Sequence, residues 1–357
     1  MISLHSRRLS RRSALSLAGA AAVAPVLAAC SSGGAGDAAP PSSGAGAAAG
    51  SQATGGDGAS VPTGIPDGMG SGQGNDVFPR TVAHFQGSTE IAAAPAKVVI
   101  TGTGQLDVAL TLGIVPIGST AGEGAQMVPD YLAKAFPQQA DALSAMTSLG
   151  KRTAPDIETI ASLSPDLIVM NNSGKDAASL YASLSEIAPT VVTQGKGTNW
   201  KQDFLLMADA LGKPDTAQTW LDGFRTDAAE AGESIDSAAT VSLLRRDGDR
   251  IRIFGAISLA GSVLADMGAA RPESQQFTDD VSQEISAEKL DQADGDWILY
   301  GVQGGDASQL TSMDLWPTLK AVSEDHAVQV DDDPFYLNAG PTAARTVLTT
   351  VSETVKK

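Results

Sequence analysis

The fold of this chain is decided by a segment that joins a short helix to a buried strand, IETIASLSPDLIVM at residues 157–170. Its first half is an amphipathic helical turn or two, and the continuous apolar run after the Pro-Asp stop is typical of a parallel strand. The same order returns in ISAEKLDQADGDWILY at residues 285–300. In both copies a glutamate lies eight positions before the aspartate that opens the strand, Glu158 before Asp166 and Glu288 before Asp296. The sequence therefore predicts two lobes built on one plan, each presenting a glutamate on its surface.

Short strands and helices alternate through both halves of the chain, which predicts an α/β fold with parallel sheets and helices on both faces. We expect an N-lobe at residues 77–198, linking helices at 199–238 and a C-lobe at 239–357. One linking helix of about 20 residues, beginning near Asp215, would reach roughly 30 Å and run along both lobes. In the C-lobe, Asp247-Gly248-Asp249 is a hairpin turn between two strands.

The first 29 residues are typical of an export signal. A basic start, SRRS at 10–13, leads into an apolar run that is too short for a membrane span and ends LAAC at 27–30. This ending predicts that the chain is cut before Cys30 and lipidated on its thiol. The paired arginines resemble a twin-arginine signal. Residues 30–76 are mostly Gly, Ala, Ser and Pro, so we expect a disordered tether that holds the folded body off a membrane.

The charge of the chain excludes one class of partner. The formal net charge is -17, and loss of the four arginines of the leader takes it to about -21. Nucleic acid is not expected as a partner, because phosphates need a basic surface. The same acidity repels anions at long range, so an anion site on this chain must be locally basic. Cys30 is the only cysteine, and therefore no disulfide is expected within the mature chain.

The sequence offers no catalytic constellation. The three histidines, His5, His84 and His326, lack zinc spacing. The turn Gly102-Thr103-Gly104 lacks the third glycine of a dinucleotide motif, since position 107 is Asp. The run 331–333, three aspartates, could bind a hard cation or form a solvated turn. An enzyme is therefore not supported, and no cofactor is expected.

The two matched glutamates indicate a docking role. Each lies at the start of a short surface helix, where the helix dipole favours the ionised form. One alternative is that each glutamate merely stabilises the N-terminus of its own helix and has no partner. Their repetition at one offset instead favours pairing with arginines of a partner protein, because the guanidinium fork matches a carboxylate.

These residues carry a resemblance to the substrate-binding lipoproteins of iron–siderophore and cobalamin ABC importers. It rests on GKRTAPDIE at 150–158, LSPDLIV at 163–169, IAPT at 187–190, ISAEKL at 285–290 and WPTLKAV at 316–322. The resemblance implies a bilobal monomer with a long helix between the lobes and ligand in the cleft. It also implies that Glu158 and Glu288 dock on arginine pockets of an ABC permease, which works with its ATPase.

The resemblance further suggests which residues contact ligand. Arg152 stands where hydroxamate-siderophore binders place an arginine on the iron-bound oxygens; the alternative is an ordinary surface arginine. Tyr336 matches a cleft tyrosine; the alternative is that its ring only packs in the core. Arg271 and Phe277 lie where relatives place cleft-lining residues. Trp200, which comes just before the linking helices, is a further candidate, as are Lys175 and Asn172, which follow the carboxyl end of a strand, where ligands of open α/β sheets lie.

The expected ligand is a ferric siderophore of the hydroxamate or mixed-ligand kind. The few aromatic residues make a haem or corrinoid ligand less attractive. Such a binder of the same fold, or a cell-envelope scaffold protein with an incompetent cleft, remains the alternative.

Overall fold

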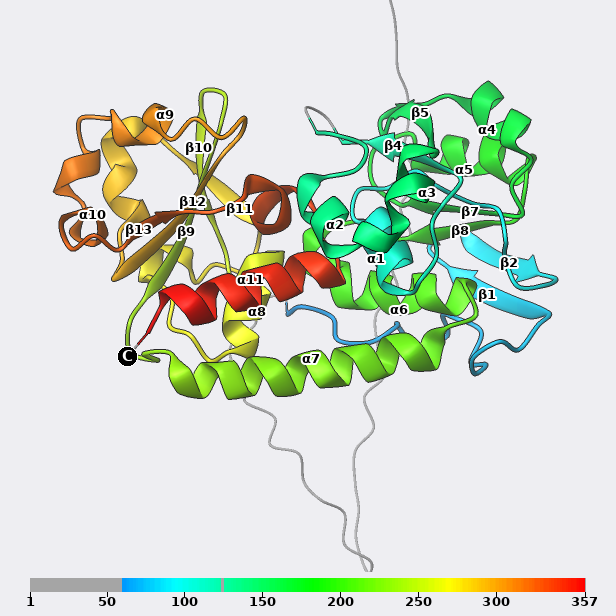
Figure 1. The fold of residues 1–357 in the computed structure, drawn as a ribbon, viewed down its shortest axis with the longest axis horizontal. Helices are drawn as coiled ribbons and strands as arrows, with labels where there is room; N and C mark the ends of the chain where they lie inside the picture. The colour runs from blue at the N-terminus through cyan, green and yellow to red at the C-terminus, as the bar shows by residue number, and fades with distance from the viewer. Residues whose placement is uncertain (1–59, 123–124, 357) are drawn as a thin grey trace, which may run out of the picture. The chain divides into compact units, whose positions relative to one another are not determined.

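The computed structural model describes residues 60–122 and 125–356. The export signal, Cys30 and the first part of the predicted tether lie outside the described residues. The two predicted lobes are present, each built around its own sheet, and a small hairpin packs beside the first (Figure 1). The predicted α/β fold in two lobes is confirmed. None of the described helices is long and apolar enough to cross a membrane.

The N-lobe contains a six-stranded sheet with the order β6-β5-β4-β3-β7-β8. Neighbouring strands are parallel except for the β5–β6 pair. The elements of this lobe are β1 Arg80–His84, β2 Gly87–Ile91, β3 Val98–Ile100, α1 Gln105–Thr111, β4 Gly118–Ala121, α2 Asp130–Ala135, η1 Pro137–Gln139, α3 Ala140–Ser144, β5 Thr147–Lys151, β6 Ala154–Pro155, α4 Ile157–Leu163, β7 Leu167–Asn171, α5 Ala177–Ser185 and β8 Thr190–Thr193.

The C-lobe contains a five-stranded mixed sheet with the order β11-β10-β9-β12-β13. The strands β9, β12 and β13 are parallel, whereas β10 and β11 are antiparallel to their neighbours, because a turn at Gly248 folds β9 onto β10. The elements are β9 Val241–Asp247, β10 Arg250–Phe254, α8 Leu259–Asp266, η3 Glu273–Gln275, β11 Ser282–Ile285, η4 Ala287–Ala293, β12 Trp297–Val302, α9 Ser308–Thr311, η5 Trp316–Thr318, α10 Lys320–Ser323, β13 Ala327–Gln329 and a π-helical turn, η6 Asp333–Leu337.

The two strand-opening aspartates of the repeated segments make equivalent contacts. In the N-lobe, the carboxylate of Asp166 accepts hydrogen bonds from the backbone N–H groups of Ala96 and Lys97, both at 2.9 Å, just before β3. In the C-lobe, Asp296 accepts from the N–H of Thr240 at 2.7 Å, just before β9. Each aspartate therefore fixes the start of the neighbouring parallel strand. The repeat seen in the sequence is a repeat of structure.

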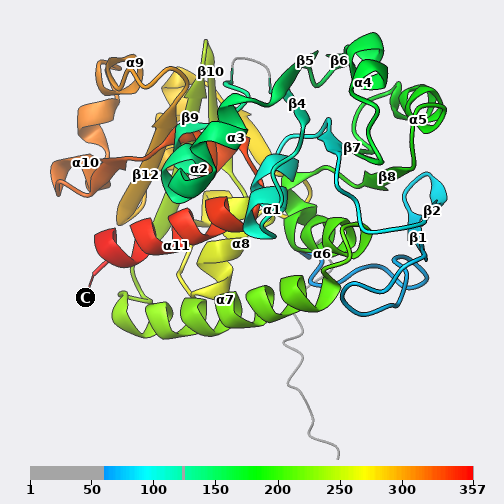
Figure 2. The ribbon, with the colours of Figure 1, turned by 45° about the vertical axis from the view of Figure 1, so that its right-hand side comes forward.

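Three helices connect the lobes. After η2 Gly197–Asn199, α6 Trp200–Ala210 leads into α7 Pro214–Ser234, which runs along the base of both lobes (Figures 1 and 2). The last helix, α11 Pro341–Thr354, packs against α7 and α8 and against α1 of the N-lobe. These helices share one large hydrophobic core, and separate clusters cover the opposite faces of the two sheets.

A buried aspartate of the N-lobe holds the start of α11. The carboxylate of Asp107, on α1, accepts hydrogen bonds from the backbone N–H groups of Thr342 and Ala343 at 2.8 and 2.9 Å and from the hydroxyl of Tyr131 at 3.2 Å. Burial raises the pKa of Asp107, and the hydrogen bonds act in the opposite direction. Asp107, which stands where a dinucleotide motif requires its third glycine, therefore connects the N-lobe to α11.

The packed chain begins earlier than the predicted boundary at residue 77. Residues 60–76 belong to the folded body: the N–H of Gly70 donates to Ala83 at 2.8 Å, and Ser71 donates to the carboxylate of Asp209. Asp209 also forms a buried ion pair with Arg80 at 2.8 Å. The prediction of a tether up to residue 76 is corrected here, because polar backbone contacts order a segment that has little apolar surface.

Candidate functional site

The cleft between the lobes holds a cavity of about 250 Å³ that is lined from both sides. Its N-lobe wall follows the carboxyl ends of β3, β4 and β5, where ligands of open α/β sheets lie. Its C-lobe wall is formed by the β9–β10 hairpin. We call this cavity the arginine chamber, because four arginines line it, namely Arg152, Arg245, Arg250 and Arg252.

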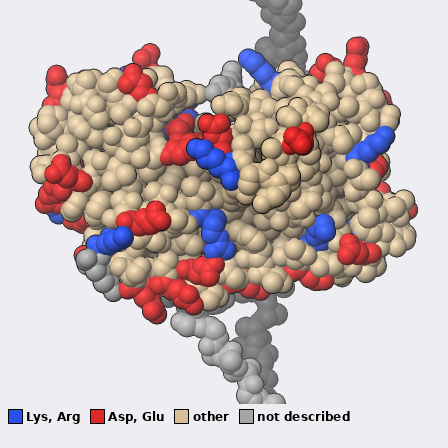
Figure 3. Space-filling view, viewed as in Figure 1, with Lys and Arg blue, Asp and Glu red and all other residues tan. Residues whose placement is uncertain are grey.

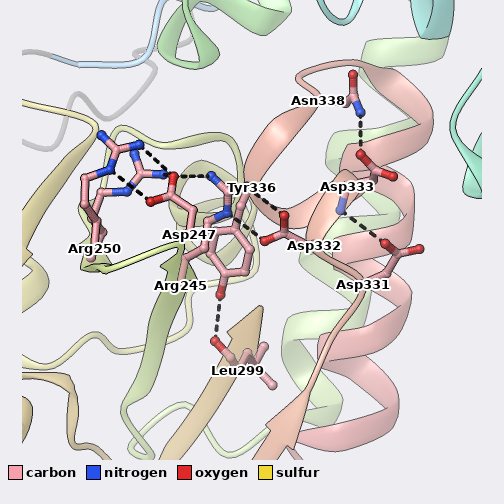
Figure 4. A network of polar contacts seen from close by, with 10 residues as sticks. Arg245, Asp247, Arg250, Leu299, Asp331, Asp332, Asp333, Tyr336 and Asn338 are labelled. Carbon is pink, nitrogen blue, oxygen red and sulfur yellow. Dashed lines mark hydrogen bonds and ion pairs between the residues drawn. The ribbon is translucent and has the colours of Figure 1, made fainter. Parts of the chain in front are cut away.

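The hairpin places three of these arginines around one carboxylate. Arg250 pairs with Asp247 in the β9–β10 register, and Arg252 pairs with Arg245, so these side chains share one face of the hairpin. Asp247 accepts hydrogen bonds from Arg245 at 3.2 Å, from Arg250 at 2.9 and 3.1 Å and from Arg252 at 2.5 Å (Figure 4). Asp332 supplies a second carboxylate, paired with Arg245.

The arginine chamber is locally basic in an acidic protein. The carboxylates of Asp107 and Asp247 line it beside the four guanidinium groups, and Asp332 pairs with Arg245, so guanidinium groups still outnumber carboxylates there, whereas acidic side chains outnumber basic ones on the face shown in Figure 3. The side chain of Arg250 is 57% exposed and that of Arg252 is 19% exposed, so both can reach a ligand. Burial lowers the pKa of Arg252, and the charge of Asp247 opposes that shift. The arrangement suits an anion that carries several oxygens.

Arg152 brings the fourth positive charge from the N-lobe. It lies in the turn between β5 and β6, and its backbone N–H donates to Ala121 at 3.1 Å. Among the described residues, its guanidinium has no hydrogen-bond or ion-pair partner. Arg152 therefore faces the hairpin arginines across the chamber with its donors available.

A second chamber of about 160 Å³ adjoins the first, and Leu337 and Asn338 line both. Tyr336 lines this second chamber with its ring, while its hydroxyl donates to the carbonyl of Leu299 at 2.6 Å. Burial raises the pKa of Tyr336.

Asp203 also lines the second chamber. Burial raises its pKa to about 6, although its carboxylate accepts hydrogen bonds from two backbone N–H groups, at 2.7 and 2.8 Å.

A family model described as periplasmic binding protein matches residues 98–334. The chain belongs to the periplasmic binding protein family. One relative is the probable siderophore-binding lipoprotein YfiY of Bacillus subtilis (strain 168), 30% identical over 289 residues, which are 75% of this chain and 85% of the relative. Another is the Fe(3+)-citrate-binding protein YfmC of the same organism, 24% identical over 78% of this chain and 88% of the relative.

A solved structure has the same fold. It is the crystal structure of Staphylococcus aureus SirA complexed with staphyloferrin B, with a TM-score of 0.64 and 26% sequence identity. The likeness covers 77% of this chain and 97% of SirA.

Two of the predicted ligand residues, Arg152 and Tyr336, line the chambers of this periplasmic binding protein. Arg271 does not: its Nη2 donates to the carbonyl of Phe254 at 2.7 Å and to Gln275 at 2.6 Å inside the C-lobe. Its other guanidinium nitrogens are buried without a partner among the described residues, and burial lowers its pKa to about 10. Phe277 packs against Gly255. Both residues support the β10 end of the cleft from behind.

The remaining candidates lie apart from the chambers. Trp200 is only 1% exposed; its indole N–H donates to Ser262 at 3.0 Å, so it anchors α6 against α8 and does not reach the cleft. That prediction is corrected, because the indole fills the core between the lobes. The side-chain oxygen of Asn172 accepts a hydrogen bond from Gln86 at 2.6 Å. Lys175 is exposed and lines a separate groove on the N-lobe.

The two predicted docking glutamates are both exposed on their lobes. Glu158 lies in the first turn of α4, which Asp156 caps by accepting the N–H of Thr159 at 3.0 Å. Glu288 lies in the first turn of η4, and its own backbone N–H lowers its pKa, as does the side chain of Ser286. Both glutamates therefore lie exposed in the first turn of a short helix, and their docking role stays a prediction.

Sequence reasoning missed the hairpin arginines. Four of the nine arginines that follow Cys30 lie between residues 245 and 252. A period-two spacing puts Arg250 and Arg252 on one face of a strand. In a chain of net charge -17, this concentration was the signal that could have located the anion site. Among the described residues, no group of three His, Cys, Asp or Glu side chains could hold a metal ion.

Proposed function

We propose that this protein is an extracytoplasmic receptor, anchored by a lipid on Cys30, that captures a ferric siderophore and delivers it to an ABC permease. The observation that carries the proposal is the arginine chamber, a basic site shared by two lobes of an acidic protein. The same class of ligand is supported by YfiY, a probable siderophore-binding lipoprotein, by YfmC, an Fe(3+)-citrate-binding protein, and by the SirA complex with staphyloferrin B.

The charge of the chamber favours one kind of siderophore. Three hydroxamates neutralise ferric iron, whereas a ligand that also offers citrate-type carboxylates leaves a complex of net negative charge. Four arginines suit the second kind, because each guanidinium can form two parallel hydrogen bonds with a carboxylate. We therefore propose a mixed-ligand, carboxylate-bearing ferric siderophore, held in the chamber by Arg152, Arg250 and Arg252.

Delivery would use the two lobe surfaces. We propose that Glu158 and Glu288 pair with arginines of the permease and thereby set the orientation of the docked receptor. The ferric complex is the cargo, and the protein is proposed to act as a monomer without a resident cofactor. The family binds substrates, which agrees with a role in capture instead of catalysis.

The proposal is tested by titrating the full-length protein with three ligands: a ferric citrate–hydroxamate siderophore, a neutral ferric trihydroxamate and haem. Calorimetry should show the tightest saturable binding with the first. Arg252→Ala should weaken it by about tenfold or more, the value of a charged hydrogen bond.

Arg246→Ala is the matched control, because Arg246 donates to the carbonyl of Gln309 at 2.8 Å and does not line the chamber. Equal losses in the two variants, or saturable binding of haem alone, would contradict the proposal.

A further inference from the structure

A groove of about 560 Å³ lies on the N-lobe beside the arginine chamber. Its lining comes from Thr101 after β3, from the segment 152–157 that leads into α4, and from the segment that runs from the end of β7 through the first two turns of α5. Arg152 lines both the groove and the chamber, so the two spaces meet at its side chain. None of the described residues of the C-lobe contributes to the lining. We call this space the α4–α5 groove.

The arginine chamber alone is small for a ligand site, and two spaces adjoin it: the second chamber of about 160 Å³ and the larger α4–α5 groove of about 560 Å³. Small-molecule sites usually measure about 300–1,000 Å³. The chamber, at about 250 Å³, falls below that range, whereas the α4–α5 groove, at about 560 Å³, lies within it. A siderophore that places its iron among the arginines therefore has room for a further part in the groove.

The lining of the groove defines the chemistry of that part. Its apolar wall consists of aliphatic side chains, among them Pro155, Ile157 and Leu180, and none of the described residues that line it is aromatic. Arg152 and Lys175 add two positive charges and Asp176 adds one negative charge. Such a surface suits a flexible aliphatic chain that carries a carboxylate, and it offers no stacking face for a catechol ring.

We propose that the α4–α5 groove is a second subsite, which binds an aliphatic arm of the siderophore that ends in a carboxylate. The inference rests on the proposed function, since the iron-bearing part of the same ligand occupies the arginine chamber. Arg152 contacts both parts of the ligand at their junction, and Lys175 pairs with the carboxylate at the end of the arm.

Two probes of matched headgroup test the inference. Both are ferric complexes of citrate amidated at one terminal carboxyl, the first with methylamine and the second with aminocaproate, so that the iron-binding groups are the same. The full-length protein should bind the second probe at least about tenfold more tightly, because the methylenes of the arm leave water.

Two variants assign the preference to the groove. Leu180→Asp should reduce this preference to about threefold or less, while the methylamide probe binds as before. Ala182→Asp adds the same charge at an exposed position of α5 outside the groove lining and should leave it intact. Lys175→Ala, at an exposed site that cannot disturb folding, should also lower the preference, whereas Lys134→Ala should not.

The outcomes separate the two proposals. Equal affinity for the two probes, or a preference that survives both groove variants, would overturn the groove subsite and leave the proposed function standing. A failure of both ferric complexes to bind saturably would overturn the anionic ferric ligand itself, and the groove subsite with it.

Discussion

Arg245 and Asp332 are joined by two parallel hydrogen bonds, from Nε to Oδ1 and from Nη2 to Oδ2, each of 2.7 Å (Figure 4). The two side chains are only 4% and 12% exposed. This pair connects β9, on the chamber wall, to the residue that precedes the π-helical turn η6. Asp332 therefore orients the most buried arginine of the chamber while neutralising part of its charge.

Loss of this carboxylate should destabilise the protein. Asp332→Ala leaves Arg245 buried with one weaker partner, Asp247 at 3.2 Å, and we expect the free energy of unfolding to fall by about 3 kcal/mol. Asp331→Ala, at the exposed neighbouring aspartate, should cost less than about 1 kcal/mol. Denaturant unfolding of both variants compares them. Equal unfolding midpoints would show that the pair does not stabilise the C-lobe.

Removal of Arg152 should weaken the binding of an anionic ferric chelate. Its guanidinium is available to ligand on the N-lobe side, so Arg152→Ala should cost roughly tenfold to a hundredfold in affinity. Arg152→Lys keeps the charge but not the planar fork, and it should recover only part of the loss. Lys151→Ala, at the exposed preceding residue, is the control. If Arg152→Ala binds as the wild type does, the chamber acts through the hairpin alone.

Binding of an anion should weaken as the pH rises through about 6. Burial, together with the charges of Asp331, Asp332 and Asp130, raises the pKa of Asp333 to about 6. Below that pH Asp333 is neutral, and above it a further negative charge lies near Asn338 on the chamber wall. We expect the affinity for an anionic ferric chelate to fall by roughly twofold to fivefold between about pH 5 and pH 7.

Asp333→Asn should remove that part of the pH dependence. Burial also raises the pKa of Asp203 to about 6. Asp203 therefore adds a second contribution to the pH dependence of binding, which Asp203→Asn would remove. The measurement needs a ferric chelate whose spectrum stays constant over the range, so that protonation of the ligand does not contribute. A pH profile unchanged in both variants would assign the effect to other groups.

The docking role of the glutamates predicts a separation of binding from uptake. The double variant Glu158→Ala with Glu288→Ala should lower uptake of ferric siderophore in cells by about tenfold or more, because two charge-assisted pairs are lost. Ligand affinity should not change. Glu186→Ala with Glu284→Ala removes one exposed glutamate from each lobe and is the control. Comparable uptake in the two double variants would remove the docking role.

The architecture was predictable where local signals and packing agree. The apolar run at 167–170 forms β7, the amphipathic stretch from Asp215 forms most of the 21-residue helix α7, and the turn at Gly248 joins two antiparallel strands. The repeated glutamate and aspartate revealed two equivalent lobes, because each aspartate performs the same local task. These features depend on neighbours in sequence or on one hydrophobic face.

The site was less predictable, because it depends on contacts between distant segments. Nothing near Arg271 in sequence tells whether its guanidinium points into the cleft or inward to the carbonyl of Phe254. Likewise, Trp200 looks suited to a ligand but fills the core between α6 and α8. The order of residues 60–76 depends on Asp209, more than a hundred positions away, which no local composition rule detects.

The carboxylate of Asp107 makes the last helix of the chain part of the contact between the lobes. Its partners, the N–H groups of Thr342 and Ala343, follow the described strands of both sheets in the chain. The strands of both sheets are thus already present in the chain before the residues of α11 that bind Asp107. The lobes, which α6 and α7 already join, gain this further connection only once α11 is in place.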